Sequence, residues 1–558
     1  MRVENNGAGA GGAEEWIAAH FSDPAKAAAR LAILQQSRTD GLHPGYSLAE
    51  GVRRAAHDTP NVRLIVASKD GDTTLTAAEA WRRTRHVAGG LQALGVGRGD
   101  RVAVQLPNSP EALVTYLAVN ALGAVLVPMI QALGPADTRQ ALERSNSTTL
   151  VIAARRGREV ELDWLGDLAG DGSDGSIRVV LVGESMFGGE VATVTPWAQV
   201  ESADPFSGVL PAGDVPAVLL YTSGTTSQPK AVVHTNDSIL AYLDVVPCPP
   251  FQFEGTYLWS WPSGHIGGIL AAISPMLRNV DTVILGERWD TEFLLDTLVR
   301  YDVRGMSGVT TVGLRLLDAV ESGDVDLPLE EFFTGGASIP SSFVRRAATH
   351  GWHVTRCYGS TENPVLTATV RDDPQDRRES SEGRPVRGAR VRILDDKGND
   401  CPPMVQGELA ILSAQQMLGY ESIELNDESF TADGWLRTGD LGHLDEQGFM
   451  TITDRKKDII IRGGENISSP EVEQALSTIP GVRESAVVSM PDPDLGERAC
   501  AFLIVHPGTQ IDLESVRAHF ASLGLARWKV PEALRFVDDF PRTSTGKPIK
   551  QALRDQLR

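Results

Sequence analysis

Short apolar runs alternate with amphipathic stretches from about residue 76 to residue 383. The pattern opens with Thr76 and, three residues later, Glu79, a capping-box spacing that predicts the start of a helix. Apolar positions continue this helix until the glycine-rich segment 95–99. Such alternation is typical of α/β layers built on largely parallel sheets. The predicted strands of this region are residues 101–106, 149–153, 178–182, 217–221, 281–285 and 331–333.

The pattern changes after Gly383, where strand-like segments follow one another without long helices. This change predicts a small, mainly β, barrel-like subdomain. We therefore expect an α/β fold with a large N-terminal domain, made of two α/β layered subdomains plus this β subdomain, and a small C-terminal α+β domain. The predicted strands after Gly383 are residues 390–394, 407–412, 449–453, 485–490, 500–505 and 534–537, and residues 513–523 are expected to form a helix.

The charge and the cysteines exclude several classes of protein. The 558 residues include 52 lysines and arginines and 73 aspartates and glutamates, a formal net charge of −21. A general nucleic-acid or anionic-membrane binder would need a basic surface, so neither partner is expected. The four cysteines are far apart without CxxC spacing, which argues against a disulfide framework or a zinc site.

The N-terminal stretch 1–14 is rich in Gly, Ala and Asn and is expected to be flexible. It lacks the basic and apolar regions of a signal peptide. No uninterrupted apolar run is long enough to span a bilayer, so we expect no integral membrane segment and a cytoplasmic protein.

The most informative segment runs from Tyr221 to Lys230 and reads YTSGTTSQPK. An apolar strand enters a loop dense in hydroxyl groups that contains a glycine and ends at a lysine. Polyphosphate binding needs these parts close together, namely backbone N–H groups, short donors and one cation. The loop does not have the Walker-A spacing, and a mobile Ser/Thr-rich surface loop is the alternative. The candidate phosphate-binding residues are Thr222, Ser223, Gly224, Thr225, Thr226 and Lys230.

Five further motifs follow in order, and with Tyr221–Lys230 they resemble the adenylate-forming superfamily over residues 45–558. That superfamily comprises acyl- and aryl-CoA synthetases, nonribosomal-peptide adenylation domains and firefly-type luciferases, and the chain is most similar to the acyl-CoA ligases. Six motifs in the family's order leave little room for chance. The five are Gly335–Ala337, Tyr358–Glu362, Gly434–Asp440, Asp454–Asp458 continuing to Arg462–Asn466, and Pro541–Lys547.

The resemblance implies an ATP site, and two of its acidic residues make chemical sense alone. The carboxylate of Glu362 can hold Mg²⁺, although a solvated loop acid is the alternative. Asp440 lies in a Gly-flanked turn, where it could accept the ribose hydroxyls or cap the turn. The resemblance assigns Asp440 to the ribose, with Arg455 supporting the same nucleotide. It also implies ATP contacts by Gly335, Gly336, Ala337, Tyr358, Gly359, Ser360 and Thr361.

Lys547 is the residue expected to stabilise the first half-reaction, in which a carboxylate attacks the α-phosphorus and negative charge develops. Without the motif around it, an exposed loop lysine would be the ordinary reading. His265 matches the family position beside the substrate carboxylate. No aspartate precedes it to pair an α-ammonium, so the acid is expected to lack an α-amino group. The predicted acid pocket contains Trp261, Gly264, His265, Gly268 and Gly308.

The resemblance also implies a mobile C-terminal domain, residues 457–558, that rotates about a hinge at Lys457 relative to the ATP- and acid-binding domain, residues 15–456. Rotation would withdraw Lys547 and bring in a CoA-binding loop. The residues of that loop are Arg462, Gly463, Gly464 and Glu465.

We therefore predict an ATP-dependent carboxylic acid–CoA ligase that uses ATP, Mg²⁺ and CoA and passes through an acyl-adenylate. The alternative is an acid–AMP ligase that loads a carrier-protein phosphopantetheine. A luciferase-like oxygenase is less favoured. A catalytically silent binding protein of the same fold is disfavoured, because it should have lost one of Lys230, Glu362, Asp440 and Lys547.

Overall fold

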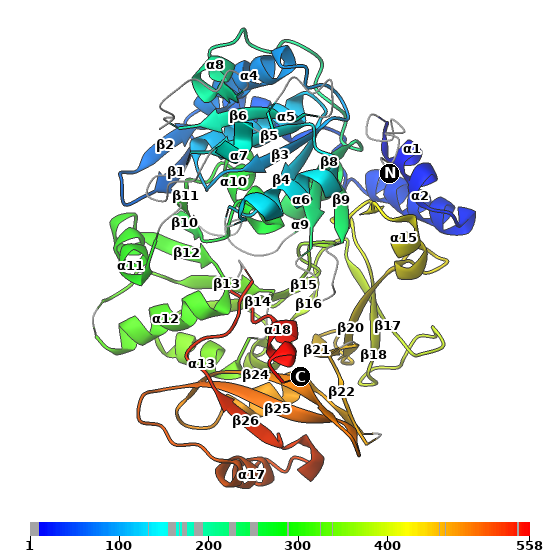
Figure 1. The fold of residues 1–558 in the computed structure, drawn as a ribbon, viewed down its shortest axis with the longest axis vertical. Coiled ribbons are helices and arrows are strands. Elements are labelled where there is room, and N and C mark those ends of the chain that lie inside the picture. Colours follow the sequence, from blue (N-terminus) through cyan, green and yellow to red (C-terminus); the bar gives the residue numbers. More distant parts are fainter. Residues whose placement is uncertain are drawn as a thin grey trace.

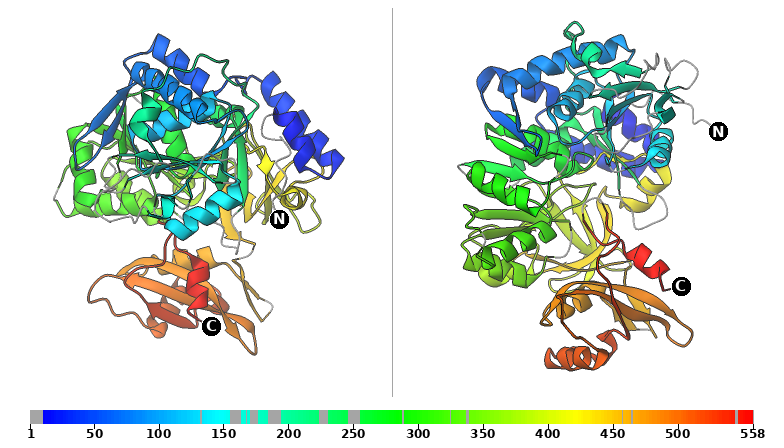
Figure 2. Two further views of the ribbon diagram at one scale, coloured as in Figure 1. Left: turned by 45° about the horizontal axis from the view of Figure 1, so that its top comes forward. Right: turned by 60° about the vertical axis from the view of Figure 1, so that its left-hand side comes forward.

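The computed structural model describes residues 11–557 except 132, 155–162, 167, 170–175, 184–193, 223–229, 246–254, 287–288, 324, 337–338, 457, 464 and 544–545. Within these residues the chain forms four sheets, three in a large N-terminal unit and one in a smaller C-terminal unit (Figure 1). The C-terminal unit lies below the N-terminal one in all views (Figure 2). This is the predicted division into a large α/β domain and a small α+β domain.

The first large sheet has the order β19-β9-β8-β4-β3-β5-β6-β7, and its strands from β4 to β7 run parallel. Each of the predicted runs 101–106, 149–153, 178–182 and 217–221 becomes one of its strands. The strands are β3 (Arg101–Gln105), β4 (Val125–Pro128), β5 (Thr149–Ala153), β6 (Arg178–Val182), β7 (Val194–Pro196), β8 (Pro216–Tyr221), β9 (Ala231–Thr235) and β19 (Gly419–Tyr420).

The second large sheet has the order β16-β15-β14-β13-β12-β10-β11-β1-β2, with β14 to β1 parallel. The predicted runs 281–285 and 331–333 correspond to its strands β11 and β13. The strands are β1 (Arg63–Ala67), β2 (Thr73–Thr76), β10 (Thr256–Trp259), β11 (Thr282–Leu285), β12 (Val303–Ser307), β13 (Glu331–Gly335), β14 (His353–Tyr358), β15 (Thr367–Ala368) and β16 (Arg384–Pro385).

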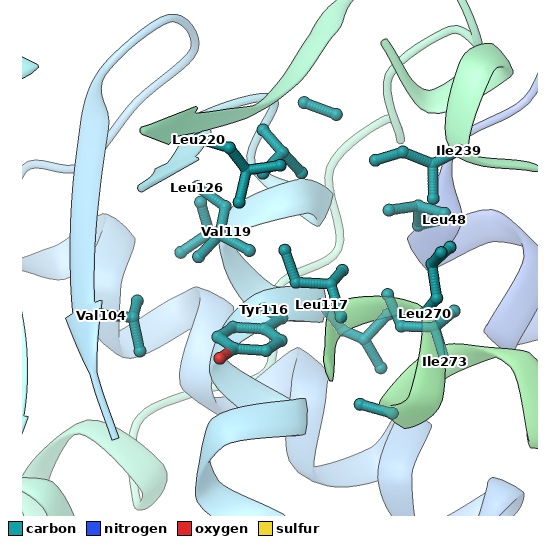
Figure 3. Close-up of a cluster of buried hydrophobic side chains, with 14 of the residues drawn as sticks. Leu48, Val104, Tyr116, Leu117, Val119, Leu126, Leu220, Ile239, Leu270 and Ile273 are labelled. Carbon is teal, nitrogen blue, oxygen red and sulfur yellow. The ribbon is translucent and has the colours of Figure 1, made fainter. Parts of the chain in front are cut away.

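Helices cover the faces of both large sheets, and α5 and α10 pack against each other in the core (Figure 1). Every residue of α5 except Glu111 is buried, as expected of a helix enclosed by other elements. Figure 3 shows Tyr116 and Leu117 of α5 among side chains from strands of the first large sheet and from helices α3, α9 and α10. The helices are α1 (Ala13–His20), α2 (Pro24–Thr39), α3 (Leu48–Asp58), α4 (Ala77–Ala93), α5 (Pro110–Ala121), α6 (Pro135–Ser145), α7 (Asp163–Gly166), α8 (Trp197–Glu201), α9 (Asn236–Val245), α10 (Ile266–Arg278), α11 (Thr291–Arg300), α12 (Thr310–Glu321), α13 (Ser341–Thr349), α14 (Gln375–Ser380) and α15 (Ile423–Ser429).

The mainly β subdomain is an antiparallel sheet of β17 (Arg390–Leu394), β18 (Gly407–Leu412), β20 (Leu436–Leu444) and β21 (Met450–Arg455). Its strand order does not return to β17, so it is an open sheet rather than a closed barrel in the described part of the chain. The C-terminal unit has its own apolar core, around β22–β26 and α16–α18. Its elements are β22 (Ile460–Arg462), β23 (Glu465–Ile467), α16 (Ser469–Leu476), β24 (Val482–Asp492), β25 (Gly496–Val505), α17 (Leu513–Ser522), β26 (Ala533–Phe536) and α18 (Lys550–Asp555).

Two local expectations need adjustment. The stretch predicted to be flexible up to residue 14 overlaps a helix, because α1 begins at Ala13 and buries Ala13 and Trp16. Thr76 caps α4 by accepting from the Glu79 N–H, which is one of the two bonds of a full capping box. Among the described helices, none combines the length and hydropathy required to cross a lipid bilayer.

Candidate active site

Four parallel strands end at one edge of the second large sheet, and about half of the predicted site residues lie at or just after their ends. The register aligns Trp259 with Ser307 and Gly335 with Cys357. Carboxyl ends of parallel strands form the usual ligand-binding edge of an open α/β sheet. The segments after β10, β12, β13 and β14 therefore bring together the predicted acid-pocket and adenine residues and the loop 358–362.

Glycines at this edge allow neighbouring backbones to approach closely. A Cβ on Gly335 would collide with the Cys357 sulfur, and one on Gly359 would collide with the Pro364 carbonyl. Gly336 has a φ of +76°, a conformation that favours glycine, and open space lies beside it. This leaves an uncovered stretch of backbone against which a flat ring can lie. Ala337, also predicted to contact ATP, is outside the described residues.

Asp440 lies at the centre of a hydrogen-bonded group next to this edge. The Tyr358 hydroxyl donates to Asp440 Oδ2 at 2.6 Å, and Arg455 Nε donates to Oδ1 at 2.7 Å. Asp440 and Arg455 are register partners on β20 and β21, so the antiparallel pairing itself places the cation beside the carboxylate. Burial and the adjacent Asp440 raise the pKa of Tyr358 well above its ordinary value. Tyr358 is therefore a neutral hydrogen-bond donor.

Lys547 reaches the same place from the C-terminal unit. The loop before α18 rises to the edge of β13 and β14 (Figure 1), and it is closed by a 2.8 Å bond from the Thr543 N–H to the Lys547 carbonyl. Desolvation and then the positive charge of Arg455 lower the pKa of Lys547, while Asp440 opposes the shift. The charges of Asp440 and Arg455 therefore both influence the ammonium of Lys547.

Glu362 lies in the loop after β14 and is held by a residue from the other large sheet. The Tyr420 hydroxyl donates to Glu362 Oε1 at 2.8 Å, and the Met417 N–H donates to the Glu362 carbonyl at 2.8 Å. Lys230 Nζ is 4.8 Å from the centroid of the Tyr420 ring, so the lysine and the carboxylate lie on one tyrosine. The 2.8 Å bond fixes one oxygen of the Glu362 carboxylate beside the phosphate loop.

His234 supports the neighbouring residue Thr361. His234 Nε2 is 2.7 Å from the Thr361 carbonyl, and its ring is completely buried. Burial lowers the pKa of His234 to about 4, so the ring is neutral and donates from Nε2. The sequence analysis missed both Tyr420 and His234, because each acts on a loop more than fifty residues away and neither lies in a motif-like spacing.

The base of the predicted phosphate loop is closed by Thr222 and Lys230. The Thr222 N–H donates to the Lys230 carbonyl at 3.0 Å, and the Lys230 N–H donates to Thr222 Oγ1 at 3.3 Å. The predicted phosphate ligands Ser223, Gly224, Thr225 and Thr226 are outside the described residues. The structure does show Lys230, the cation at the end of the loop, which contacts the same tyrosine as Glu362.

The residues present suit Mg²⁺ bound together with phosphates. Mg²⁺ is commonly held by one or two carboxylates while substrate phosphates and water complete its shell. Glu362 offers one such carboxylate, oriented by Tyr420. In the described part of the chain no cluster of three His, Cys, Asp or Glu side chains offers a complete protein cage.

The predicted acid pocket follows β10 and is packed tightly between the sheets. Trp261 Nε1 donates to Ser307 Oγ at 2.6 Å, which fixes the indole across β12. A Cβ on Gly264 would lie 2.8 Å from the Ile130 nitrogen, and one on Gly308 would lie 2.5 Å from Ser260 Oγ. Burial lowers the pKa of His265 to about 4, so a neutral imidazole faces this region. A Cβ on Gly268 would collide with the Pro262 carbonyl, so this loop also requires glycine there.

The predicted CoA-binding residues lie elsewhere. Arg462 pairs with Glu532, and the Gly463 N–H donates to the Leu495 carbonyl at 2.8 Å. Glu465 is on β23, the other strand of this hairpin, which forms an edge of the C-terminal sheet. The structure thus brings Lys547 to Asp440 and leaves the described hairpin residues bound within the C-terminal unit. Lys457 and Gly464 are outside the described residues.

Comparisons with known proteins agree with this arrangement. A family model described as AMP-binding enzyme matches residues 52–421, and one described as AMP-binding enzyme C-terminal domain matches residues 471–547. The chain is 30% identical over 526 residues to a medium-chain fatty-acid–CoA ligase of Escherichia coli, covering 93% of this chain and 92% of that one. It is 33% identical over 512 residues to a salicylyl-CoA synthase / salicylate adenylyltransferase of Streptomyces sp, covering 88% and 91%. The structure is similar to that of ATP-bound MatB from Rhodopseudomonas palustris, with a TM-score of 0.77, 27% identity and coverage of 91% and 98%.

Proposed function

This chain belongs to the AMP-binding enzyme family, and on that premise we propose how its residues share the steps of one reaction. The chain is an AMP-forming acid–CoA ligase, which converts a carboxylic acid, ATP and CoA to acyl-CoA, AMP and pyrophosphate. The observation that carries the residue roles is that the loop of Lys547 reaches the edge of β13 and β14, within electrostatic range of Asp440 and Arg455.

In the first step an oxygen of the acid attacks the α-phosphorus of ATP, and the bond to pyrophosphate breaks. In this proposal the Lys547 ammonium contacts both the attacking carboxylate and the α-phosphate oxygens, whose negative charge increases during the attack. Asp440 accepts hydrogen bonds from the ribose hydroxyls, and Arg455 holds the Asp440 carboxylate in place. Gly336 leaves room for the adenine ring, and Gly335 lets β13 pass close to Cys357.

Lys230 and Glu362 are the residues that bind and orient the phosphates in this proposal. Lys230 offsets phosphate charge at the end of the loop. Glu362 would hold Mg²⁺, which supplies charge neutralisation and orientation for the leaving pyrophosphate. The Tyr420 hydroxyl holds one oxygen of the Glu362 carboxylate, and Lys230 lies over the ring of the same tyrosine.

The acid is proposed to lack an α-amino group. No carboxylate stands among Trp261, Gly264, His265, Gly268 and Gly308, and a buried ammonium without one would be costly. The neutral His265 can accept or donate one hydrogen bond near the acid without adding charge. The two curated relatives described above are named for a fatty acid and for salicylate, and neither acid has an α-amino group.

In the second step the thiolate of CoA attacks the acyl carbon, and AMP leaves as its bond to that carbon breaks. We propose that the C-terminal unit, residues 457–558, turns about Lys457 between the steps, which would withdraw Lys547 and present the hairpin of Arg462, Gly463, Gly464 and Glu465 to the thiol. The separate apolar core of the C-terminal unit is consistent with movement as a rigid body.

The test is pyrophosphate release from Mg²⁺-ATP across aromatic, alicyclic and aliphatic acids, with and without CoA. Acid-dependent release over many turnovers only when CoA is present, with acyl-CoA formed, would support the proposal and name the substrate class. Release of about one equivalent per enzyme despite CoA would instead indicate a carrier-protein acceptor. No release with any acid, together with no ATP binding in a direct titration, would contradict the proposal.

A further inference from the structure

Helices α1 and α2 pack against the segment that carries Tyr420. Residues 414–420 of this segment are all buried. Both helices precede residue 52, where the family match begins. Figures 1 and 2 show them beside α15, away from β13 and β14. These helices therefore do not touch the proposed nucleotide site directly, but they contact a segment that does.

Arg30 of α2 is a buried cation without a carboxylate partner among the ion pairs of the described residues. Arg30 is only 1% exposed, and burial lowers the pKa of its guanidinium to about 10. Nη2 donates to the Met417 carbonyl at 2.9 Å, and the guanidinium lies 4.9 Å from the centroid of the Phe430 ring. Burying an arginine is costly unless its donors are used. Its main hydrogen bond here is to the backbone of the segment that carries Tyr420.

Tyr420 itself is fixed by Asn426 and by α1. Asn426 Oδ1 accepts from the Tyr420 N–H at 2.7 Å, and its Nδ2 donates to the Tyr420 carbonyl at 2.7 Å and to the His20 carbonyl at 2.8 Å. A Cβ on Gly419 would lie 3.0 Å from the Trp16 ring, so α1 also packs directly on this strand. The backbone on both sides of Tyr420 is thus held against the N-terminal helices.

The same segment holds Glu362 twice. The Met417 N–H donates to the Glu362 carbonyl, and the Tyr420 hydroxyl donates to its carboxylate, each at 2.8 Å. Arg30 binds the carbonyl of Met417, whose N–H bonds to Glu362. A displacement of Met417 would therefore shift Glu362 and the donor that orients its carboxylate together.

We propose that Arg30 is a positioning residue for the adenylation step, which acts through Met417 and Tyr420 to set the orientation of the Glu362 carboxylate. The inference rests on the proposed function, because it takes Glu362 as the residue that holds Mg²⁺ with ATP. The N-terminal helices would then tune the enzyme's requirement for Mg²⁺, although no residue of α1 or α2 contacts the substrate.

The experiment measures acid-dependent ATP–pyrophosphate exchange against Mg²⁺ concentration for Arg30→Lys, Tyr420→Phe and the double variant. Tyr420→Phe removes one hydroxyl and should raise the half-saturating Mg²⁺ concentration roughly tenfold, as outer-shell changes at metal sites commonly do. Arg30→Lys keeps the positive charge and should raise the half-saturating Mg²⁺ concentration several-fold. The double variant should show no more than the larger single effect, because both changes act on one carboxylate. Arg38→Lys makes the same exchange on α2 at a residue paired with Asp214, and it should change nothing.

Thermal unfolding of each variant separates this role from a purely structural one. A lower melting temperature for Arg30→Lys with an unchanged Mg²⁺ dependence would overturn the inference. A double variant whose increase in half-saturating Mg²⁺ concentration equals the product of the two single increases would also overturn it. If the wild-type enzyme gave no exchange with any acid and bound no Mg²⁺-ATP in a direct titration, the proposed function would fail instead. The wild-type control thus distinguishes the two failures.

Discussion

Tyr358 and Asp440 belong to different sheets, yet the Tyr358 hydroxyl donates to Asp440 Oδ2 over 2.6 Å. Tyr358 ends β14 of a large parallel sheet, whereas Asp440 is on β20 of the small antiparallel one. Their bond therefore joins the two subdomains at the proposed ribose site. Because Arg455 donates to the other carboxylate oxygen, the Asp440 side chain is oriented before a nucleotide arrives.

Asp440→Asn should weaken ATP binding while the fold persists. The substitution keeps the shape of the side chain but removes the charge that accepts hydrogen bonds strongly. A hydrogen bond to a charged group contributes about 1.5–3 kcal/mol, so the KM for ATP should rise about tenfold or more. Steady-state rates measured over a range of ATP concentrations at saturating acid give this KM. Asp433→Asn, at an exposed aspartate that pairs with Arg392, is the matched control. An unchanged KM for ATP would rule out the ribose role of Asp440.

Lys547→Ala should separate the two half-reactions. Loss of the ammonium removes stabilisation of the charge that develops at the α-phosphate, so adenylation should slow by roughly a hundredfold or more. Transfer from a supplied acyl-adenylate to CoA should be nearly unaffected, because Lys547 is proposed to withdraw before that step. Single-turnover assays of each half-reaction provide the measurement.

The control for this prediction is Lys397→Ala, which removes a lysine from an exposed turn of the β subdomain. It should leave both half-reactions at the wild-type rate. Equal losses in both half-reactions of Lys547→Ala would contradict the proposed division of roles.

The pH dependence of adenylation should report the lowered pKa of Lys547. Desolvation and the charge of Arg455 lower this pKa from 10.5, so the ammonium loses its proton at a lower pH than an ordinary lysine. Adenylation should therefore decline on the alkaline side as pH rises through the shifted pKa. Lys547→Arg keeps a group that stays charged, so its decline should begin at higher pH even if its maximum rate is lower. If the pH–rate profiles of the wild type and Lys547→Arg declined at the same alkaline pH, Lys547 would not be the group whose deprotonation causes the decline.

The local pattern of the sequence predicted about half of the strands that the structure describes, because burial of a short apolar run between helices depends on residues that are neighbours in the sequence. The run 331–333 became β13 and the run 407–412 became β18, and Thr76 caps α4 as expected. The strand β10 (Thr256–Trp259) was missed, as was the helical start of the chain, where Ala-rich composition hid the buried Trp16.

The residues of the candidate site could be named from local motifs in the sequence. Asp440, Glu362 and Lys547 lie in such motifs, and the fold brings Lys547 within electrostatic range of Asp440. The residues that orient them could not be found from local patterns. Tyr420 is 58 residues from Glu362 and Arg30 is 387 residues from Met417, so these contacts exist only once the sheets have assembled.

The buried His234 should make stability depend on pH on the acidic side. Folding lowers its pKa from 6.5 to about 4, so between these pH values the unfolded chain binds the proton that the folded chain excludes. The contribution of His234 is thus complete above pH 6.5 and is lost as pH falls toward 4. For this one group the free energy of unfolding should drop by about 2 kcal/mol between pH 7 and pH 5.

The prediction is tested by urea unfolding at pH 7 and pH 5 for the wild type and for His234→Gln. The glutamine amide can still donate to the Thr361 carbonyl but does not titrate, so the variant should lose about 2 kcal/mol less than the wild type over this range. Other buried histidines such as His353 titrate in both proteins and cancel in the comparison. His57→Gln, at an exposed histidine, should keep the wild-type difference between the two pH values. If His234→Gln lost as much stability as the wild type, the ring of His234 would have to be accessible to protons in the folded protein, and its neutral bond to Thr361 would be wrong.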